Sequence, residues 1–271
     1  MAIQLYDEVG SCEVNVIHIK EIVEDITLGC TGPMRAITDF GKNAVIKVFH
    51  NGQGDKVLFN EFFAYKLAHI LDIPTPEYFI GEIDKLTSIK VEFDERNTGY
   101  CFCSQYIDPV TTILPETLKW IENKDAFKDI IMFDHLIYNA DRNSGNLILT
   151  IKPKHHLYAI DYSHIFIDGE SWNRYLLQDQ MDLDMATDRT IMISNAETYQ
   201  MFISAGNLCQ KDLISLIETK YSKLSKETFY AIIDATPKEW KPSTEDCEAL
   251  VNYLESRLNN LEKIIKVIFD K

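Results

Sequence analysis

The segment from Asp134 to Asp161 constrains this chain more than any other. It reads as an apolar helix, a polar loop, a β-strand, a turn and a second strand that ends in Asp161. The loop holds Asp141 and Asn146, five positions apart. Loop and strand ends in this order would bring the side chains of Asp141, Asn146 and Asp161 to one cleft.

Phosphoryl transfer requires this set of groups. One carboxylate receives the proton of an attacking hydroxyl, while an amide oxygen and a second carboxylate hold the magnesium that neutralises the phosphates. The spacing alone is a weak indication, because the chain contains four Asp-x4-Asn pairs. Only Asp141 and Asn146 lie between an apolar helix and a ribbon that delivers another Asp. A solvated turn is the competing interpretation, since these residues favour turns.

A second constellation lies upstream. Residues 44–49 (AVIKVF) form a predicted strand in which alternation puts Lys47 on the face of Val45 and Phe49. A helix is predicted over residues 57–71, with Glu61 inside its broad apolar face. A buried carboxylate needs a cation, so Lys47 is its expected partner, and such a pair orients the lysine towards nucleotide phosphates. The alternative is a strand-edge Lys and a surface Glu.

A glycine-containing loop precedes the lysine strand. Residues 27–35 (TLGCTGPMR) lie between predicted strands at about 15–22 and 35–40. Gly29 and Gly32 would let backbone N–H groups approach phosphates closely. The loop matches neither common glycine-rich nucleotide motif, and an ordinary hairpin connection is the alternative. Thr31, in the same loop, is a candidate autophosphorylation site.

A strand over residues 100–107 (YCFCSQYI) follows a predicted hairpin of residues 78–83 and 86–93. The helical half of the chain begins soon after it. This is where a hinge between two lobes would lie, with residues 104–107 offering backbone groups to an adenine edge.

These motifs, in this order, resemble the HipA-like branch of the protein-kinase-like superfamily, which is related more distantly to phosphatidylinositol kinases. The resemblance covers about residues 12 to 170 well and the rest loosely. It is carried by GCTGP at 29–33, VIKVF at 45–49, NEFFAYKLAHILDIPTPE at 60–77, DHLIYNADRNSGNLIL at 134–149 and AIDYSHIF at 159–166. It implies a bilobal α+β fold, with a small β-rich lobe over residues 1–108 and a mainly helical lobe over 109–271.

The resemblance also implies ATP and Mg²⁺ as cofactors. Asp141 would be the catalytic base, Asn146 and Asp161 the metal ligands, and Lys47 with Glu61 the phosphate-orienting pair. Further nucleotide contacts are expected from Gly29, Thr31, Gly32, Ser104, Gln105 and Tyr106. Two departures stand out: an H-R-D triplet is absent, and Tyr162-Ser163 follows Asp161 where a DFG-type switch would have Phe-Gly.

Composition limits the partners. The net charge of −15 disfavours a broad nucleic-acid or anionic-membrane surface, and with it a lipid kinase. Because ATP is also negative, the cleft must be locally basic, and Lys47, Arg35 and Arg142 are the candidates. Neither a secretion signal nor an apolar run near 18 residues is visible. The six cysteines form no zinc pattern and suit free thiols in a reducing cytoplasm.

The pattern therefore predicts a cytoplasmic, bacterial kinase that phosphorylates a hydroxyl, with Ser or Thr of a protein as the favoured acceptor. A small-molecule or lipid kinase, a nucleotidyl transferase that places AMP on a target, and a nucleotide-binding pseudokinase are the alternatives. The resemblance allows a toxin-like role and a separate regulatory or antitoxin-like protein.

Smaller expectations concern single residues and the C-terminal half. Asp134 is either an orienting residue for the loop or a plain surface Asp, and His135 is a core residue. Helices are predicted over 209–224, 225–235 and 243–269, the last with a capping box from Ser243 and Asp246.

Overall fold

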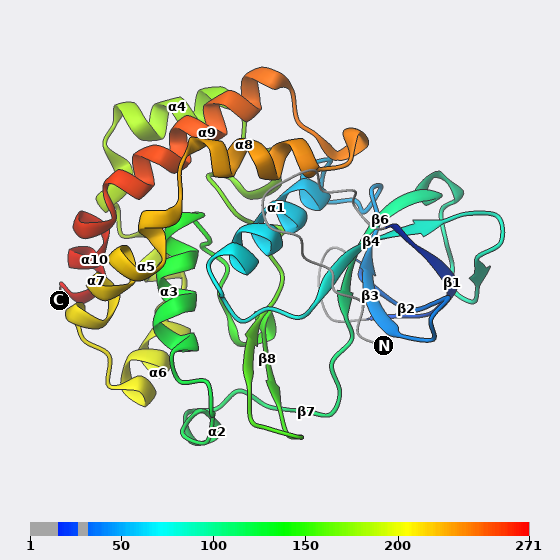
Figure 1. Cartoon of the computed structure of the whole chain (residues 1–271), viewed down its shortest axis with the longest axis horizontal. Helices are drawn as coiled ribbons and strands as arrows, with labels where there is room; N and C mark the ends of the chain where they lie inside the picture. Colours follow the sequence, from blue (N-terminus) through cyan, green and yellow to red (C-terminus); the bar gives the residue numbers. More distant parts are fainter. Residues whose placement is uncertain (1–15, 27–31, 271) are drawn as a thin grey trace.

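The chain is described by a computed structural model that covers residues 16–26 and 32–270. A β-rich N-terminal part and a helical C-terminal part lie side by side (Figure 1), which confirms the predicted fold class. The first part contains the strands β1 (Val16–Asp25), β2 (Met34–Thr38), β3 (Asn43–Lys47), β4 (Tyr78–Ile83), β5 (Ser88–Ile89) and β6 (Gly99–Gln105).

These strands form a closed barrel. Their order is β2-β3-β6-β4-β1-β5, and β1 also pairs with β2, which closes the sheet. Alternation along β3 and beyond it turns Ala44, Ile46 and Val48 into the barrel, whereas Lys47 points to the other face. The interior is small and apolar and consists of Ile19, Ile22, Met34, Ala36, Ala44, Ile46, Val48, Ile83, Cys101 and Cys103.

The predicted hairpin of residues 78–83 and 86–93 is wrong. Strand β5 has only two residues and pairs with β1 in parallel, as β4 also does. Strand β4 pairs with residues 16–18 of β1 and β5 with residues 21–22, so the chain continues along β1 and does not fold back on β4. Hydrogen bonds from the Thr87 hydroxyl to the Ile19 carbonyl and from the Lys90 amide to the Ile22 carbonyl hold this segment against β1.

A second, three-stranded antiparallel sheet belongs to the helical part. It has the order β7 (Val110–Thr111), β8 (Leu147–Thr150) and β9 (Leu157–Ala159). Asn146 directly precedes β8, and Asp161 stands two residues beyond β9. The antiparallel pairing of Leu147 with Ala159 therefore brings these two polar residues to the same end of the sheet.

The helices surround one large apolar core. The long C-terminal helix predicted over 243–269 is two helices, because the chain turns at Asn260, whose amide hydrogen bonds to the Arg257 carbonyl. Ser243 accepts the expected cap hydrogen bond from the Asp246 amide. The helices are α1 (Val57–Ile70), α2 (Pro115–Leu118), α3 (Ala126–Leu136), α4 (Arg174–Asp182), α5 (Thr190–Ser194), α6 (Ala196–Gly206), α7 (Gln210–Thr219), α8 (Lys226–Ala235), α9 (Thr244–Asn259) and α10 (Leu261–Phe269).

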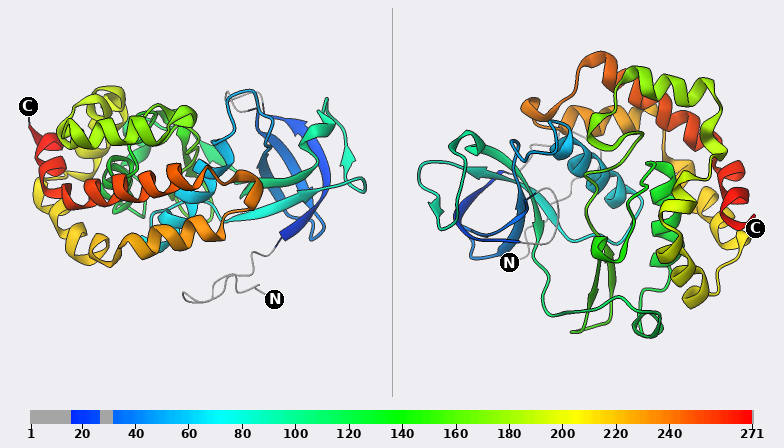
Figure 2. Two further views of the ribbon diagram at one scale, coloured as in Figure 1. Left: turned by 90° about the horizontal axis from the view of Figure 1, so that it is seen from above. Right: turned by 180° about the vertical axis from the view of Figure 1, so that it is seen from behind.

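Helix α1 lies between the barrel and the C-terminal helices (Figures 1 and 2). Its apolar residues belong to the core of the helical part and not to the barrel interior. The ring of Phe63 packs edge-to-face against Phe166 and at a tilt against Phe229, and Phe62 packs edge-to-face against Trp240. The helix that carries Glu61 is thus anchored in the larger core, although it precedes the predicted lobe boundary at residue 108, which stays a prediction.

Candidate active site

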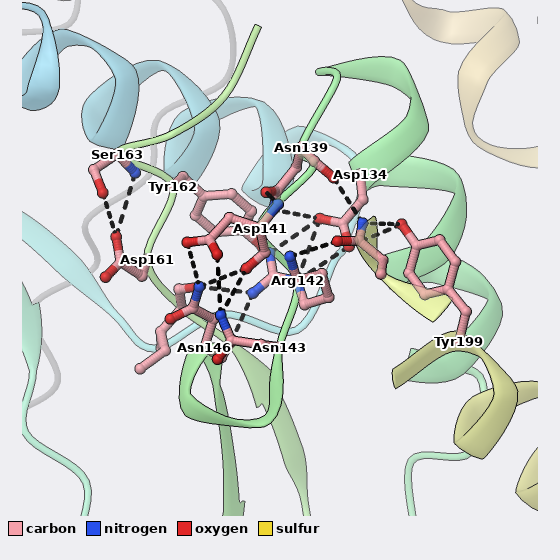
Figure 3. Close-up of polar contacts among 12 residues, drawn as sticks. Asp134, Asn139, Asp141, Arg142, Asn143, Asn146, Asp161, Tyr162, Ser163 and Tyr199 are labelled. Atoms are coloured by element: carbon pink, nitrogen blue, oxygen red, sulfur yellow. Dashed lines mark hydrogen bonds and ion pairs between the residues drawn. The ribbon is translucent and has the colours of Figure 1, made fainter. Parts of the chain in front are cut away.

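The loop between α3 and β8 holds Asp141 and Asn146 in direct contact. Asn146 Nδ2 donates hydrogen bonds to the Asp141 carbonyl, at 2.6 Å, and to Oδ2 of its carboxylate, at 3.0 Å. Asn143 Nδ2 donates to the other carboxylate oxygen at 3.1 Å. The five-residue spacing therefore corresponds to a loop that is closed by side-chain amides (Figure 3).

These contacts fix which atom of the Asn146 amide is exposed to a ligand. Because Nδ2 is used on Asp141, Oδ1 is the atom left to accept or coordinate. The Asp141 side chain itself belongs to an exposed residue, and its backbone amide is held by Asn139 Oδ1 at 3.0 Å. The loop thus presents a carboxylate at the surface on a fixed backbone.

Lys47, Glu61 and Asp161 meet at one point. Lys47 Nζ lies 2.5 Å from Glu61 Oε1 and 2.8 Å from Asp161 Oδ1. The Tyr162 amide donates to the same Glu61 oxygen, at 3.0 Å. The predicted pairing of Lys47 with Glu61 is present, and the lysine joins the barrel and α1 to the segment that follows β9.

The electrostatics of this cluster follow from one cation between two carboxylates. Burial alone would lower the pKa of Lys47, but Glu61 and Asp161 outweigh it and raise that pKa. Burial would likewise raise the pKa of Asp161, but Lys47 and the Ser163 hydroxyl hold it below its usual range. Glu61 is the more enclosed carboxylate, and burial raises its pKa to about 7 despite Lys47.

Asp161 adopts a left-handed backbone conformation, with φ of +58°, which is uncommon for a residue with a side chain. Its Oδ1 accepts a 2.6 Å hydrogen bond from the hydroxyl of Ser163, in addition to the contact with Lys47. Both contacts fall on the same oxygen. Such conformations cluster at functional sites, where the surrounding structure holds them.

Arg142 does not supply charge to the cleft, so that prediction is wrong. Its side chain has no exposed surface and forms an ion pair with Asp134, which is equally buried. Asp134 also accepts from Asn139 Nδ2 at 2.8 Å and from the Tyr199 hydroxyl at 3.3 Å. The interpretation of Asp134 as an orienting residue is confirmed, whereas a surface Asp is excluded.

Two residues of this network, Asn195 and Tyr199, were not identified from the sequence. Asn195, at the start of α6, accepts the Arg142 amide hydrogen bond and donates to the Asn139 carbonyl, both at 2.8 Å. Its Nδ2 also donates to the Tyr199 hydroxyl, at 3.0 Å. They follow Arg142 by more than fifty residues in a polar stretch, and nothing in their local pattern indicates the contact.

The remaining nucleotide-binding candidates are Gly29, Thr31, Gly32, Ser104, Gln105 and Tyr106. Gly29 and Thr31 lie outside the described residues, and Gly32 is exposed with φ of +58°. The amides of Gln105 and Tyr106 donate to the carbonyls of Glu77 and Asn43, at 2.7 and 3.2 Å, so these donors are already used.

Arg35 and His135, two further residues considered from the sequence, have different surroundings. Arg35 is half-buried and hydrogen bonds to Glu24 at 2.6 Å, so its charge is matched in part. His135 is the expected core residue, and burial lowers its pKa to about 3.

The donor set fits a hard divalent cation. Asn146 Oδ1 and the Asp161 carboxylate offer oxygen atoms, the type of donor that Mg²⁺ prefers. No group of three or more His, Cys, Asp or Glu side chains suited to a metal occurs among residues 16–26 and 32–270. Mg²⁺ sites that use one or two protein ligands and complete their shell with substrate phosphates are common in phosphotransferases.

Comparison with known families adds to this geometry. A family model described as HipA-like kinase matches residues 19–268. The chain belongs to the HipA-like kinase family. The resemblance carried by the sequence motifs is therefore confirmed, and the match extends over the C-terminal helices, where those motifs are loose.

One solved structure similar to this chain is that of a kinase. The crystal structure of the Helicobacter pylori proinflammatory kinase CtkA has a TM-score of 0.58 and 13% identity, over 93% of this chain and 98% of that one. The likeness shows the fold alone at this identity. Family and fold together support phosphotransfer in general.

Two further structures have TM-scores below 0.5. The Golgi casein kinase with Mn/ADP bound has a TM-score of 0.49 and 12% identity, over 94% of this chain and 72% of that one. The Shewanella oneidensis MR-1 HipA, in complex with HipB and operator DNA, has 0.38 and 12%, over 99% and 68%. No protein of curated function matches the sequence.

Among the described residues, no helix of this HipA-like kinase is both long and apolar enough to cross a membrane.

Proposed function

We propose that this chain is an ATP- and Mg²⁺-dependent kinase that transfers the γ-phosphate to a Ser or Thr hydroxyl of a protein. The observation that carries the proposal is the contact of Lys47 Nζ with both Glu61 and Asp161. It joins three residues that are far apart in the sequence, and a lysine held by a helix glutamate next to a metal-binding aspartate is the arrangement that protein kinases use.

Each side chain has a role in this proposal. Lys47, oriented by Glu61, would bind nucleotide phosphates, and Asn146 Oδ1 with Asp161 would hold the metal. Asp141 would accept the proton of the attacking hydroxyl. When bound, Mg²⁺ supplies neutralisation of the phosphate charge. Gly32, with the loop around Gly29 and Thr31, and the segment Ser104–Tyr106 are proposed to contact the nucleotide.

The exposure of the catalytic loop supports a protein acceptor. Asp141 and the residues 143–145 that follow it are exposed, so a hydroxyl on a macromolecular surface can reach the carboxylate. A closed pocket would suit a metabolite better. The four described cysteines are free thiols, which supports a reducing compartment such as the cytoplasm. A separate regulatory protein stays a prediction.

The test is incubation with γ- or α-labelled ATP and Mg²⁺, comparing the wild type with Asp141→Ala and Asp161→Asn. We expect transfer of label from γ-ATP to the protein, an added protein substrate or water, and its loss in both variants. Label from α-ATP alone would replace the proposal with nucleotidyl transfer. Nucleotide binding without any transfer would favour a pseudokinase.

A further inference from the structure

The ion pair of Asp134 and Arg142 lies directly behind the proposed metal ligands. Arg142 Nε lies 3.0 Å from Asp134 Oδ2, and Nη2 lies 3.0 Å from Oδ1, so the guanidinium meets the carboxylate with two parallel hydrogen bonds. Neither side chain has exposed surface. The attraction within a buried ion pair does not always offset the free energy that it costs to remove both charges from water. The remaining N–H donors of the guanidinium must therefore also find partners.

The third guanidinium nitrogen binds the two backbone segments that hold the proposed ligands, one just before β8 and one just after β9. Arg142 Nη1 donates to the Asn146 carbonyl at 2.6 Å and to the Ile160 carbonyl at 2.8 Å. The first carbonyl belongs to one proposed ligand, and the second belongs to the residue directly before Asp161. One nitrogen thus sets the spacing between the two backbone segments (Figure 3), reinforcing the hydrogen bond from the Ile160 amide to the Asn146 carbonyl.

The position of Arg142 is itself fixed from the helical part. Asn195 Oδ1 accepts the Arg142 backbone hydrogen bond, and Asn195 Nδ2 binds the carbonyl of Asn139. Asn139 then binds Asp134 through Nδ2 and the Asp141 amide through Oδ1. The buried hydrogen bonds therefore extend from α6 to the proposed catalytic base and to both proposed metal ligands.

We infer that Arg142 is a positioning residue that holds Asn146 and Asp161 at the separation that a divalent cation requires, with Asp134 and Asn195 keeping its guanidinium in place. The inference rests on the proposed function. Arg142 is thereby expected to affect the affinity for the metal and not the binding of phosphate. Its charge is neutralised by Asp134, and its side chain is fully buried.

The experiment titrates Mn²⁺ into the full chain with a fluorescent, non-hydrolysable ATP analogue and measures the half-saturating metal concentration. Groups that orient metal ligands typically change metal affinity about 10- to 100-fold when replaced. We expect Arg142→Lys, which keeps the charge but loses the fork of donors, to raise the half-saturating Mn²⁺ by at least about tenfold. The analogue's affinity at saturating Mn²⁺ should stay that of the wild type.

Arg257 provides a matched control. It is also buried, it donates to the His135 carbonyl at 2.6 and 2.9 Å and it packs on Tyr138 and Tyr253. Its side-chain hydrogen bonds go to His135 and not to the segments around Asn146 and Asp161. Arg257→Lys should therefore lower the melting temperature as a buried arginine substitution does, without moving the Mn²⁺ midpoint.

The outcomes separate the inference from the function on which it rests. A wild type that binds the analogue without any dependence on Mn²⁺ would overturn the proposed function, and the inference with it. A metal-dependent wild type with an unchanged midpoint in Arg142→Lys, or the same shift in Arg257→Lys, would overturn the inference alone. If Arg142→Lys does not fold, the same Mn²⁺ titration is made with Asn195→Ala and judged by the same criteria. This substitution removes the uncharged hydrogen bonds to the Arg142 amide and the Asn139 carbonyl and leaves the ion pair in place.

Discussion

The indole Nε1 of Trp172 donates a 3.0 Å hydrogen bond to Oδ1 of Asn60, the residue next to Glu61 on α1. The Nδ2 of the same amide donates to the Ser163 carbonyl at 2.8 Å. Both ends of a buried side-chain amide are thus used on the segment that follows Asp161. This arrangement ties the helix that carries Glu61 to the strand end that carries Asp161, independently of Lys47.

Asn60→Leu tests this link. The substitution keeps the approximate volume but leaves the Trp172 N–H and the Ser163 carbonyl buried without partners, at a cost of about 1 to 3 kcal/mol each. We expect urea unfolding to show a loss in that range or above it, together with slower phosphate transfer. The exposed Asn252 serves as control, since Asn252→Leu should change neither measurement. Equal stability of the wild type and Asn60→Leu would contradict the link.

Lys47→Met tests the charge balance of the central cluster. Removing one partner of a buried ion pair costs about 3 to 5 kcal/mol, because the other charge is left without compensation. Here Glu61 and Asp161 both lose their cation, so the loss of unfolding free energy should be large at pH 8. It should shrink at pH 5, as the carboxylates take up protons, while transfer stays abolished at both values.

The control for Lys47→Met is Lys42→Met at an exposed turn, which should leave stability and transfer unchanged at both pH values. A loss of stability in Lys47→Met that does not depend on pH would show that the packing of the lysine stem matters, and not its charge.

The parts of the fold that followed from the sequence are those set by local pattern. Strand β3 and helix α1 could be located by periods of two and 3.6, and the position of Glu61 among apolar residues indicated a buried cation. That reasoning led to Lys47 because β3 contains a lysine in a strand that is otherwise apolar. The spacing of Asp141 and Asn146 was also informative, because both residues belong to one short loop and their contact depends on local sequence alone.

The errors arose where distant segments decide the structure. The pairing of β4 and β5 with β1 depends on a strand sixty residues earlier, so adjacency along the chain wrongly indicated a hairpin. Arg142 was assigned to the cleft because it follows Asp141. Its actual partner was visible in one respect, because Asp134 is a charged residue inside an apolar helix and needs compensation. Asn195 and Tyr199 gave no such signal.

Glu61 gives a pH-dependent prediction with a definite sign. Burial raises its pKa from an ordinary value of 4.5 to about 7. Between these two pH values the folded chain binds more protons at this site than the unfolded chain does, so the contribution of Glu61 to the unfolding free energy falls as pH rises. Glu61→Gln cannot titrate and removes this contribution.

The measurement is the stability difference between the wild type and Glu61→Gln across pH 4.5 to 8. We expect the wild type to lose up to about 3 kcal/mol relative to the variant as pH rises to 7, and no further change above it. A difference that is constant with pH, or that grows in favour of the wild type, would show that Lys47 keeps the pKa of Glu61 near or below its ordinary value.

Gly81 in β4 packs against a pair of thiols inside the barrel. The sulfur atoms of Cys101 and Cys103 lie 3.7 Å apart. A Cβ at position 81 would stand 2.6 Å from Cys103 Sγ, 2.7 Å from Cys101 Sγ and 2.9 Å from Ile19 Cδ1. These distances are too short for atoms in contact, and overpacking a core costs about 1 to 3 kcal/mol. We therefore expect Gly81→Ala to lower the urea midpoint by a corresponding amount.

A double-mutant cycle identifies the cause of that loss. In a Cys101→Ala, Cys103→Ala background the space left by both sulfurs would accept the new methyl group, so Gly81→Ala should cost markedly less there than in the wild type. The free-energy loss from all three substitutions together should therefore be smaller than the sum of the losses from Gly81→Ala and from the two cysteine substitutions. Additive losses would mean that the barrel rejects a side chain at position 81 because of Ile19 or the backbone, and that the thiols are not what requires glycine.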